Sequence, residues 1–215
     1  MDLFPIFLKL AARPCIVIGA GHLAESKIDS LRAANAKVTV IAPTATDRIQ
    51  AQAAAGEIAW QQREYKEGDL ANHFLVVAAT NNPAVNRAVF HEARERDILC
   101  NAVDDPPFCD FYFPSVVRRG DLQIAISTAG ASPALAQKLR KEINAQLPLD
   151  AGDWLTELGN LRREVVAAEP LNDERKWLLH QLARREVCGY DQCPSRVFAR
   201  EHAKTNPTPT PEKTS

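Results

Sequence analysis

The sequence has no long apolar run. Crossing a bilayer as a helix takes about 20 consecutive apolar residues, and the longest runs here are short pieces such as residues 15–18 and 74–79. We therefore expect no membrane-spanning segment. The first five residues also lack the basic stretch followed by an apolar one that marks a secretory signal peptide, so no such segment is expected.

The chain also lacks an excess of either charge. It has 26 Lys and Arg against 27 Asp and Glu among 215 residues, for a formal net charge of -1. This balance argues against a protein that binds nucleic acid through its overall charge. The hydrophobic share of 46% is ordinary for a globular protein and excludes disorder over most of the chain.

Disulfide and metal patterns are missing as well. The five cysteines are an odd number without framework spacing, which favours a reduced chain and a cytoplasmic location. The five histidines show no metal-ligand spacing, so no metal site is expected.

The first half of the chain alternates between strand-like and helix-like patterns, which predicts an α/β fold with a parallel sheet and helices on both faces. The expected strands are residues 14–18, 37–41, 57–61, 74–79 and 98–103, and the expected helices are residues 22–35, 44–55 and 83–96.

The pattern changes near residue 111. Two strands, 111–118 and 121–127, are predicted to form a hairpin, followed by a helix from Ser132 to about residue 146. Helices are then expected near 152–168, 171–187 and 194–203, with Asn172 or Asp173 as a cap, and the Pro/Thr-rich residues 203–215 are predicted to be disordered.

Net charge differs among the same regions. Residues 1–113 hold 11 basic and 14 acidic residues, for a net charge of -3. Residues 114–148 hold 5 and 2, for a net charge of +3, and residues 149–215 hold 10 and 11, for a net charge of -1. The basic segment is therefore short and central.

The segment Gly19–Ala24 has the pattern G-x-G-x-x-A between a predicted strand and a predicted helix, the context in which this pattern indicates a Rossmann dinucleotide site. Gly19 allows a tight turn, Gly21 lets a pyrophosphate approach the backbone, and Ala24 lets the helix pack closely on the strand. His22 lies inside the loop and is a candidate cofactor contact. The alternative is a glycine-rich turn that binds nothing.

The acidic residue that binds the ribose in such sites should follow the second strand. Here the strand ends in Ile41–Thr44, where Thr44 can bond a ribose but no carboxylate is present. Arg48 is the nearest candidate for a 2′-phosphate. The sequence favours NAD over NADP.

Polar residues follow two further strands. Asp104 and Asp105 come after the strand 98–103, at the edge where the nicotinamide end of a cofactor is expected. A carboxylate there can act as a general base, although a turn in which Asp bonds nearby backbone explains the same residues. Thr80 has the same placement after residues 74–79, and its alternative role is in capping the next helix.

The loop Ser127–Pro133 precedes a predicted helix. Its backbone N–H groups can cradle an anion, and a simple capped turn is the alternative. Cys109 lies near the candidate carboxylates without an identifiable partner base.

Several strings together resemble the sirohaem synthase family, in its precorrin-2 dehydrogenase and sirohydrochlorin ferrochelatase portion. They are the residues Pro5–Leu8, Gly19–Lys27, Ala78–Thr80, Asn101–Asp104, Phe113–Ser115 and Ser127–Arg140. The resemblance runs from about residue 3 to residue 148, and more weakly to about residue 200.

This resemblance implies NAD-dependent oxidation of precorrin-2 to sirohydrochlorin, followed by insertion of Fe²⁺ to give sirohaem. It also implies a homodimer with an NAD-binding Rossmann domain (1–113), a small α+β dimerisation region (114–148) and a helical domain (149–202). The family's aspartate corresponds to Asp104, and its cofactor contacts correspond to His22, Leu23, Pro43 and Thr44.

The family's serine loop, which is phosphorylated in some members, corresponds to Ser127 and Thr128. Precorrin-2 carries many carboxylates, so the basic segment is expected to face it. The expected substrate contacts are Asp105, Arg118, Ser127, Thr128 and Lys138. Asp104 can remove the proton that accompanies hydride loss and can accept pyrrole protons as iron enters.

Some members of this family only dehydrogenate, and the sequence leaves iron insertion open. A different hypothesis is an NAD-sensing regulatory module without chemistry. The length of 215 residues leaves no room for the methyltransferase half of fused sirohaem synthases, so a separate enzyme is expected to supply precorrin-2.

Overall fold

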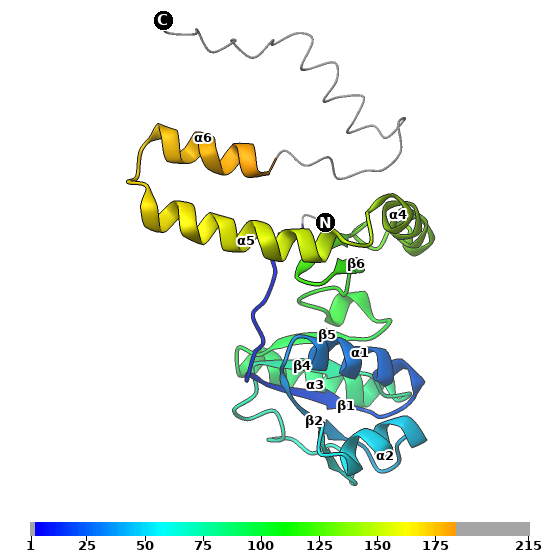
Figure 1. Cartoon of the computed structure of the whole chain (residues 1–215). Helices are drawn as coiled ribbons and strands as arrows, with labels where there is room; N and C mark the ends of the chain where they lie inside the picture. Colours follow the sequence, from blue (N-terminus) through cyan, green and yellow to red (C-terminus); the bar gives the residue numbers. More distant parts are fainter. Residues whose placement is uncertain (1–2, 184–215) are drawn as a thin grey trace, which may run out of the picture. The chain divides into compact units, whose positions relative to one another are not determined.

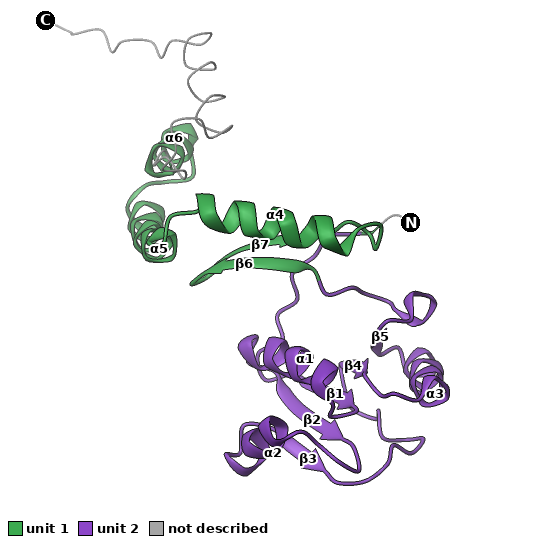
Figure 2. Cartoon of the chain, turned by 90° about the vertical axis from the view of Figure 1, so that its right-hand side faces the viewer, with its two compact units in different colours: residues 1–3, 114–215 green, residues 4–113 purple. Residues whose placement is uncertain are grey.

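The computed structural model describes residues 3–183. The chain divides into two compact units, which Figures 1 and 2 show. We call residues 4–113 the amino-terminal unit, and residue 3 with residues 114–183 the carboxy-terminal unit. In residues 3–183, no helix is long and apolar enough to cross a membrane.

A five-stranded parallel sheet forms the centre of the amino-terminal unit. Its strands are β1 (Pro14–Ile18), β2 (Lys37–Ile41), β3 (Ala59–Gln61), β4 (Leu75–Ala78) and β5 (Leu99–Ala102), in the order β3-β2-β1-β4-β5. Every residue of β4 is buried, and so is every residue of β1 except Pro14. Burial on both faces explains why these strands are continuous apolar runs, and the predicted parallel α/β fold is confirmed.

Helices cover the sheet. They are α1 (His22–Ala33), α2 (Asp47–Ala54) and α3 (Pro83–Glu95), with a short 3₁₀ turn η1 (Pro106–Phe108). Ala24, Ile28 and Leu31 of α1 lie in one core cluster with Val17 and Val77. The apolar stripe of α3, including Val89, Phe90 and Ala93, lies in a second cluster. These two clusters hold the ends of β1 and β4 in place. A cavity opens at those ends.

The carboxy-terminal unit begins with an antiparallel hairpin of β6 (Ser115–Arg119) and β7 (Leu122–Ile126). Helix α4 (Pro133–Gln146) lies along this hairpin (Figure 2). Helices α5 (Ala151–Ala168) and α6 (Asp173–Leu182) follow. A small core formed by Val117, Leu147 and Ala151 joins hairpin and helices.

The predicted starts of the second helix and of the hairpin were wrong, and the third strand begins at Ala59 rather than at residue 57. Helix α2 begins at Asp47 rather than Thr44, because the Thr46 hydroxyl accepts the Ile49 N–H and caps the helix. Residues 111–114 do not extend the hairpin, because Phe111 and Phe113 pack on the first core of the amino-terminal unit. The cap of α6 is Asn172, whose side chain accepts the Arg175 N–H. The predicted helix at 194–203 and the tail 203–215 lie outside the described residues.

Gly152 lets α5 approach the hairpin. A Cβ at Gly152 would lie 2.8 Å from the carbonyl carbon and oxygen of Arg119, whereas a Cβ at Gly159 on the same helix would meet only the Arg163 guanidinium at 3.8 Å.

We predict that Gly152→Ala lowers the free energy of unfolding by about 1–3 kcal/mol, because backbone must move to admit the methyl group. Gly159→Ala is the control and should be neutral or raise it by about 0.5–1 kcal/mol through helix propensity. Urea denaturation followed by tryptophan fluorescence measures both. Equal effects of the two variants would contradict the close packing at Gly152.

Candidate functional site

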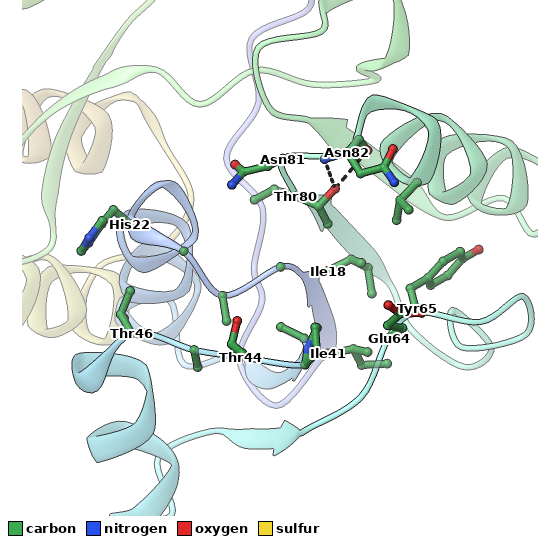
Figure 3. A pocket seen from close by; sticks show the side chains of 18 residues that line it. Ile18, His22, Ile41, Thr44, Thr46, Glu64, Tyr65, Thr80, Asn81 and Asn82 are labelled. Carbon is green, nitrogen blue, oxygen red and sulfur yellow. Dashed lines mark hydrogen bonds between the residues drawn. The ribbon is translucent and has the colours of Figure 1, made fainter.

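A cavity of about 670 Å³ opens at the carboxyl ends of β1, β2 and β4 (Figure 3). It is lined by residues 18–22 after β1, 41–46 after β2, 64–65 in a loop, and 79–82 with Val85 after β4. In open α/β sheets, ligands bind at this edge where the strand order reverses, and here the order reverses between β1 and β4. Its volume is in the range of ligand pockets.

Gly19 forms the tight turn between β1 and α1. Its φ is +106°, a conformation that side chains rarely adopt, and a Cβ there would lie 2.4 Å from the Ala79 carbonyl oxygen. The turn is therefore pressed against the end of β4. Gly19 and Ala79 both line the cavity.

The start of α1 supplies an anion-binding end. Gly21 is the N-cap residue, and no side chain caps the helix. Nothing lies within 4 Å of the position that a Cβ of Gly21 would occupy. Open space over uncapped N–H groups at the positive end of a helix dipole suits a pyrophosphate. Ala24 is fully buried, which lets α1 pack closely against the sheet. These residues fit a dinucleotide.

The residues after β2 form one wall of the cavity. Pro43 and Thr44 are exposed and line it, and Thr46 lines it beside the start of α2. His22 also lines it, with a side chain that is 91% exposed. Figure 3 places His22 on the same side of the cavity as Thr46. Leu23 is not among the lining residues.

Thr80 lines the opposite wall and is held by α3. Its hydroxyl donates to the Asn86 side-chain oxygen over 2.7 Å, and the Asn86 amide donates to the Thr80 carbonyl oxygen over 3.1 Å. Its neighbour Asn82 caps α3 through the Ala84 N–H. Thr80 thus takes part in local capping and still faces the cavity (Figure 3). Sequence reasoning missed the buried Asn86, since a polar residue inside a helix gave no distinctive signal.

Glu64 and Tyr65 reach the cavity from the loop after β3, and they too were missed. Glu92 of α3 is buried and fixes this loop by accepting hydrogen bonds from the Tyr65 hydroxyl and the Leu70 N–H. Arg96 balances its charge at 2.8 Å. Burial and the Glu92 carboxylate raise the pKa of Tyr65, so its hydroxyl stays protonated.

Asp104 lies one strand away from the cavity lining, directly after β5. The pairing of Ala78 with Ala102 places the end of β5 beside the end of β4, and the Val103 N–H donates to the Ala78 carbonyl. Asp104 is exposed and has a φ of +62°, a left-handed conformation that Asp tolerates better than most residues. It therefore stands at the edge beyond Thr80.

Lys27 of α1 supplies positive charge near Asp104. Its ammonium lies 4.2 Å from the centroid of the Phe113 ring, a cation–π contact. Burial lowers the pKa of Lys27, and the negative charge of Asp104 opposes that shift.

The segment after Asp104 is fixed against β5. The buried Asn101 donates its side-chain N–H to the Phe111 carbonyl over 2.7 Å. Asp105 lies 3.6 Å from the Arg87 guanidinium. The Cys109 thiol donates to the Ala102 carbonyl, and burial raises its pKa. Cys109 is therefore a structural thiol rather than a nucleophile.

The other predicted substrate contacts lie in the carboxy-terminal unit. The Ser127 hydroxyl accepts the Ala129 N–H and the Thr128 hydroxyl accepts the Ser132 N–H, so this loop has the capped-turn geometry. Arg118 is exposed on the hairpin. Lys138 is exposed on α4, 3.8 Å from Glu142.

Arg119 differs from its neighbours in the basic segment, because its guanidinium donates to the Asn144 side chain and carbonyl at the end of α4. It stabilises this unit and is not free for a ligand. Among residues 3–183, no group of three or more His, Cys, Asp or Glu side chains is placed to hold a metal ion.

Comparisons with known proteins agree with this geometry. A family described as NAD(P)-binding matches residues 6–115, the stretch that contains the whole cavity. A second family, described as sirohaem biosynthesis protein central, matches residues 119–146.

Among curated relatives, siroheme synthase 1 of Yersinia enterocolitica is 43% identical over 165 residues, which are 77% of this chain and 35% of the relative. Siroheme synthase of Neisseria meningitidis is 39% identical over 79% of this chain and 35% of its own length. The chain thus spans about a third of the length of these relatives.

A solved structure described as SirC, precorrin-2 dehydrogenase, has a TM-score of 0.73 and 25% identity to this chain. The match covers 94% of this chain and 100% of the solved one.

The two glycines of the loop generate a paired prediction. Gly19→Ala should lower the free energy of unfolding by about 1–3 kcal/mol, because it combines a strained φ with a backbone clash. Gly21→Ala should leave stability nearly unchanged and weaken NAD⁺ binding, because its methyl group would enter the space above the helix end. Thermal denaturation and calorimetric titration with NAD⁺ separate the two effects. Full NAD⁺ affinity in Gly21→Ala would contradict the assignment of this space to the pyrophosphate.

Proposed function

The chain belongs to the sirohaem synthase family, whose dehydrogenase portion it matches, and from this premise we propose that it oxidises precorrin-2 to sirohydrochlorin with NAD⁺. The observation that carries the proposal is the position of Asp104 at the end of β5, next to the strand whose end lines the dinucleotide cavity. The name of the solved precorrin-2 dehydrogenase supports the same reaction.

Different residues of the cavity bind different parts of the dinucleotide. The start of α1 holds the pyrophosphate, and Pro43 and Thr44 lie beside the adenosine ribose. Thr80 and its partner Asn86 fix the wall nearest the nicotinamide end. NAD⁺ supplies a hydride acceptor when bound. The loops after β1, β2 and β4 would hold it at the edge of the sheet that continues into β5.

Oxidation of precorrin-2 removes a hydride and a proton. We assign the uptake of the proton to the exposed Asp104 carboxylate, with the Lys27 ammonium as a nearby positive charge. Asp105, held by Arg87 at 3.6 Å, lies beside it at the substrate end. We further assign Arg118, Lys138, Ser127 and Thr128 to contacts with the carboxylates of the tetrapyrrole.

We also propose that the chain inserts Fe²⁺ into sirohydrochlorin. Iron is a substrate in this step, and the two pyrrole protons that it displaces need an acceptor. The exposed Asp104 carboxylate can serve as that acceptor. The sirohaem synthase relatives support the step by their name.

The assembly proposed is a cytoplasmic homodimer. Its support is the apolar segment Leu3–Leu8, in which Phe4 is 84% exposed and Phe7 is 68% exposed. Monomeric proteins rarely expose contiguous large apolar side chains, and such patches mark interaction sites.

The Asp104 assignment predicts a specific loss. Asp104→Asn should lower kcat/KM for precorrin-2 oxidation by about a hundredfold or more, the usual contribution of a general base, with NAD⁺ affinity retained. Asp105→Asn is the matched neighbour and should raise KM while most of kcat remains. The measurement is the appearance of the sirohydrochlorin spectrum under anaerobic conditions. Undiminished turnover by Asp104→Asn would remove Asp104 from the reaction.

Iron insertion has its own test. Adding Fe²⁺ or Co²⁺ to sirohydrochlorin with this protein should accelerate chelation over the protein-free rate, and Asp104→Asn should slow it. Visible absorption follows the metal complex. A rate equal to the protein-free control would restrict the protein to dehydrogenation.

A further inference from the structure

The wall of the cavity after β2 lacks the carboxylate that binds the ribose hydroxyls in many NAD sites. Ile41–Thr44 carries only a hydroxyl at this place. The choice between NAD and its 2′-phosphorylated form must therefore depend on neighbouring residues. Arg48 is the nearest cation after the strand, and a guanidinium is well suited to bind a phosphate in a bidentate way.

Arg48 is engaged by α1 instead. Its Nη2 lies 2.6 Å from Asp29 Oδ2, and the Gln52 side-chain N–H donates to Asp29 Oδ1 over 2.9 Å. Gln52 is only 9% exposed, so it orients the Asp29 carboxylate from a nearly buried position. Both carboxylate oxygens are occupied, which fixes the direction in which Asp29 holds the guanidinium.

The pair adds little to stability. The side chains of Arg48 and Asp29 are 59% and 34% exposed, and ion pairs this exposed contribute little to the free energy of unfolding. The consequence of the pair lies in where it holds the Arg48 guanidinium. Thr44 and Thr46 line the cavity on either side of Ala45, whereas Arg48 is not a lining residue.

The rim next to Thr46 carries negative charge. Glu25 of α1 accepts a hydrogen bond from the Thr46 hydroxyl, which holds the pKa of this carboxyl below its usual range, with further contributions from His22 and Arg48. The Glu25 carboxylate thus adds negative charge next to the lining residue Thr46, which disfavours a phosphate there.

We propose that Asp29 determines cofactor specificity: with Gln52 it holds the Arg48 guanidinium out of the cavity, so that the site takes a dinucleotide with a free 2′-hydroxyl and rejects the 2′-phosphate. Asp29 is a positioning residue, since it acts through Arg48. The inference rests on the proposed function only in that a nicotinamide dinucleotide binds this cavity.

The test is a set of binding measurements on the full chain. The unmodified protein, Asp29→Ala, Arg48→Ala and the double variant are titrated with NAD⁺ and with NADP⁺ at low ionic strength, where exposed charges are least screened. Release of a guanidinium that then bonds a phosphate should tighten NADP⁺ binding by about two- to fivefold in Asp29→Ala, because an exposed ion pair can hold back no more than that. NAD⁺ affinity should stay within about twofold.

The double variant tests whether Arg48 is the group that binds the phosphate. If Arg48 binds the phosphate in Asp29→Ala, removing Arg48 as well returns NADP⁺ affinity to the level of Arg48→Ala. If Asp29→Ala does not fold, Asp29→Asn replaces it, because the asparagine retains an oxygen that can accept the Gln52 N–H. Asp29→Asn should also tighten NADP⁺ binding, but by less than Asp29→Ala.

Three outcomes would overturn the inference: equal NAD⁺ and NADP⁺ affinities in the unmodified protein, unchanged NADP⁺ affinity in the Asp29 variants, or a gain that survives loss of Arg48. Failure of the unmodified protein to bind either dinucleotide would instead contradict the proposed function, and the inference with it.

Discussion

The close approach of two backbone segments, at Gly19 and at Ala79, is the constraint on which the site depends. A Cβ at Gly19 would lie 2.4 Å from the Ala79 carbonyl oxygen, so only glycine lets the first turn meet the end of β4. That contact directs α1 so that its uncapped N–H groups face the cavity. The same β4 pairs with β5, which carries Asp104 to the adjacent edge. The cavity wall and Asp104 are thus positioned by one sheet.

Much of the fold could be predicted from local sequence patterns, because each pattern reflects interactions between residues that are close together in the sequence. The apolar runs of β1 and β4 predicted buried strands, and the glycine spacing predicted the turn at Gly19. The start of α2 was misplaced because Thr44 and Thr46 are equally good caps by sequence, and only the packing of the wall decides between them. The extension of the hairpin into Phe111 was wrong because its packing partners lie in a core far away in sequence.

The contacts around the site that were missed share one property. The partners in these contacts are 6 to 27 residues apart, as for Asn86, Glu92 and the Asp29–Arg48 pair. The sequence around a polar side chain on a helix does not indicate which distant residue it contacts. Each of them positions a cavity residue or keeps a charge away from the cavity. In the proposed function, cofactor specificity therefore depends largely on contacts between elements, whereas the turn at Gly19 is formed by residues close together in the sequence.

The most direct measurement is the stoichiometry of precorrin-2 oxidation by the unmodified protein under anaerobic conditions, with NADH followed by its absorbance and sirohydrochlorin by its own spectrum. The account predicts that one NADH forms for each precorrin-2 consumed and that no conversion occurs without NAD⁺. Binding of NAD⁺ without any conversion of precorrin-2 would contradict the account and favour a regulatory module that uses the same cavity.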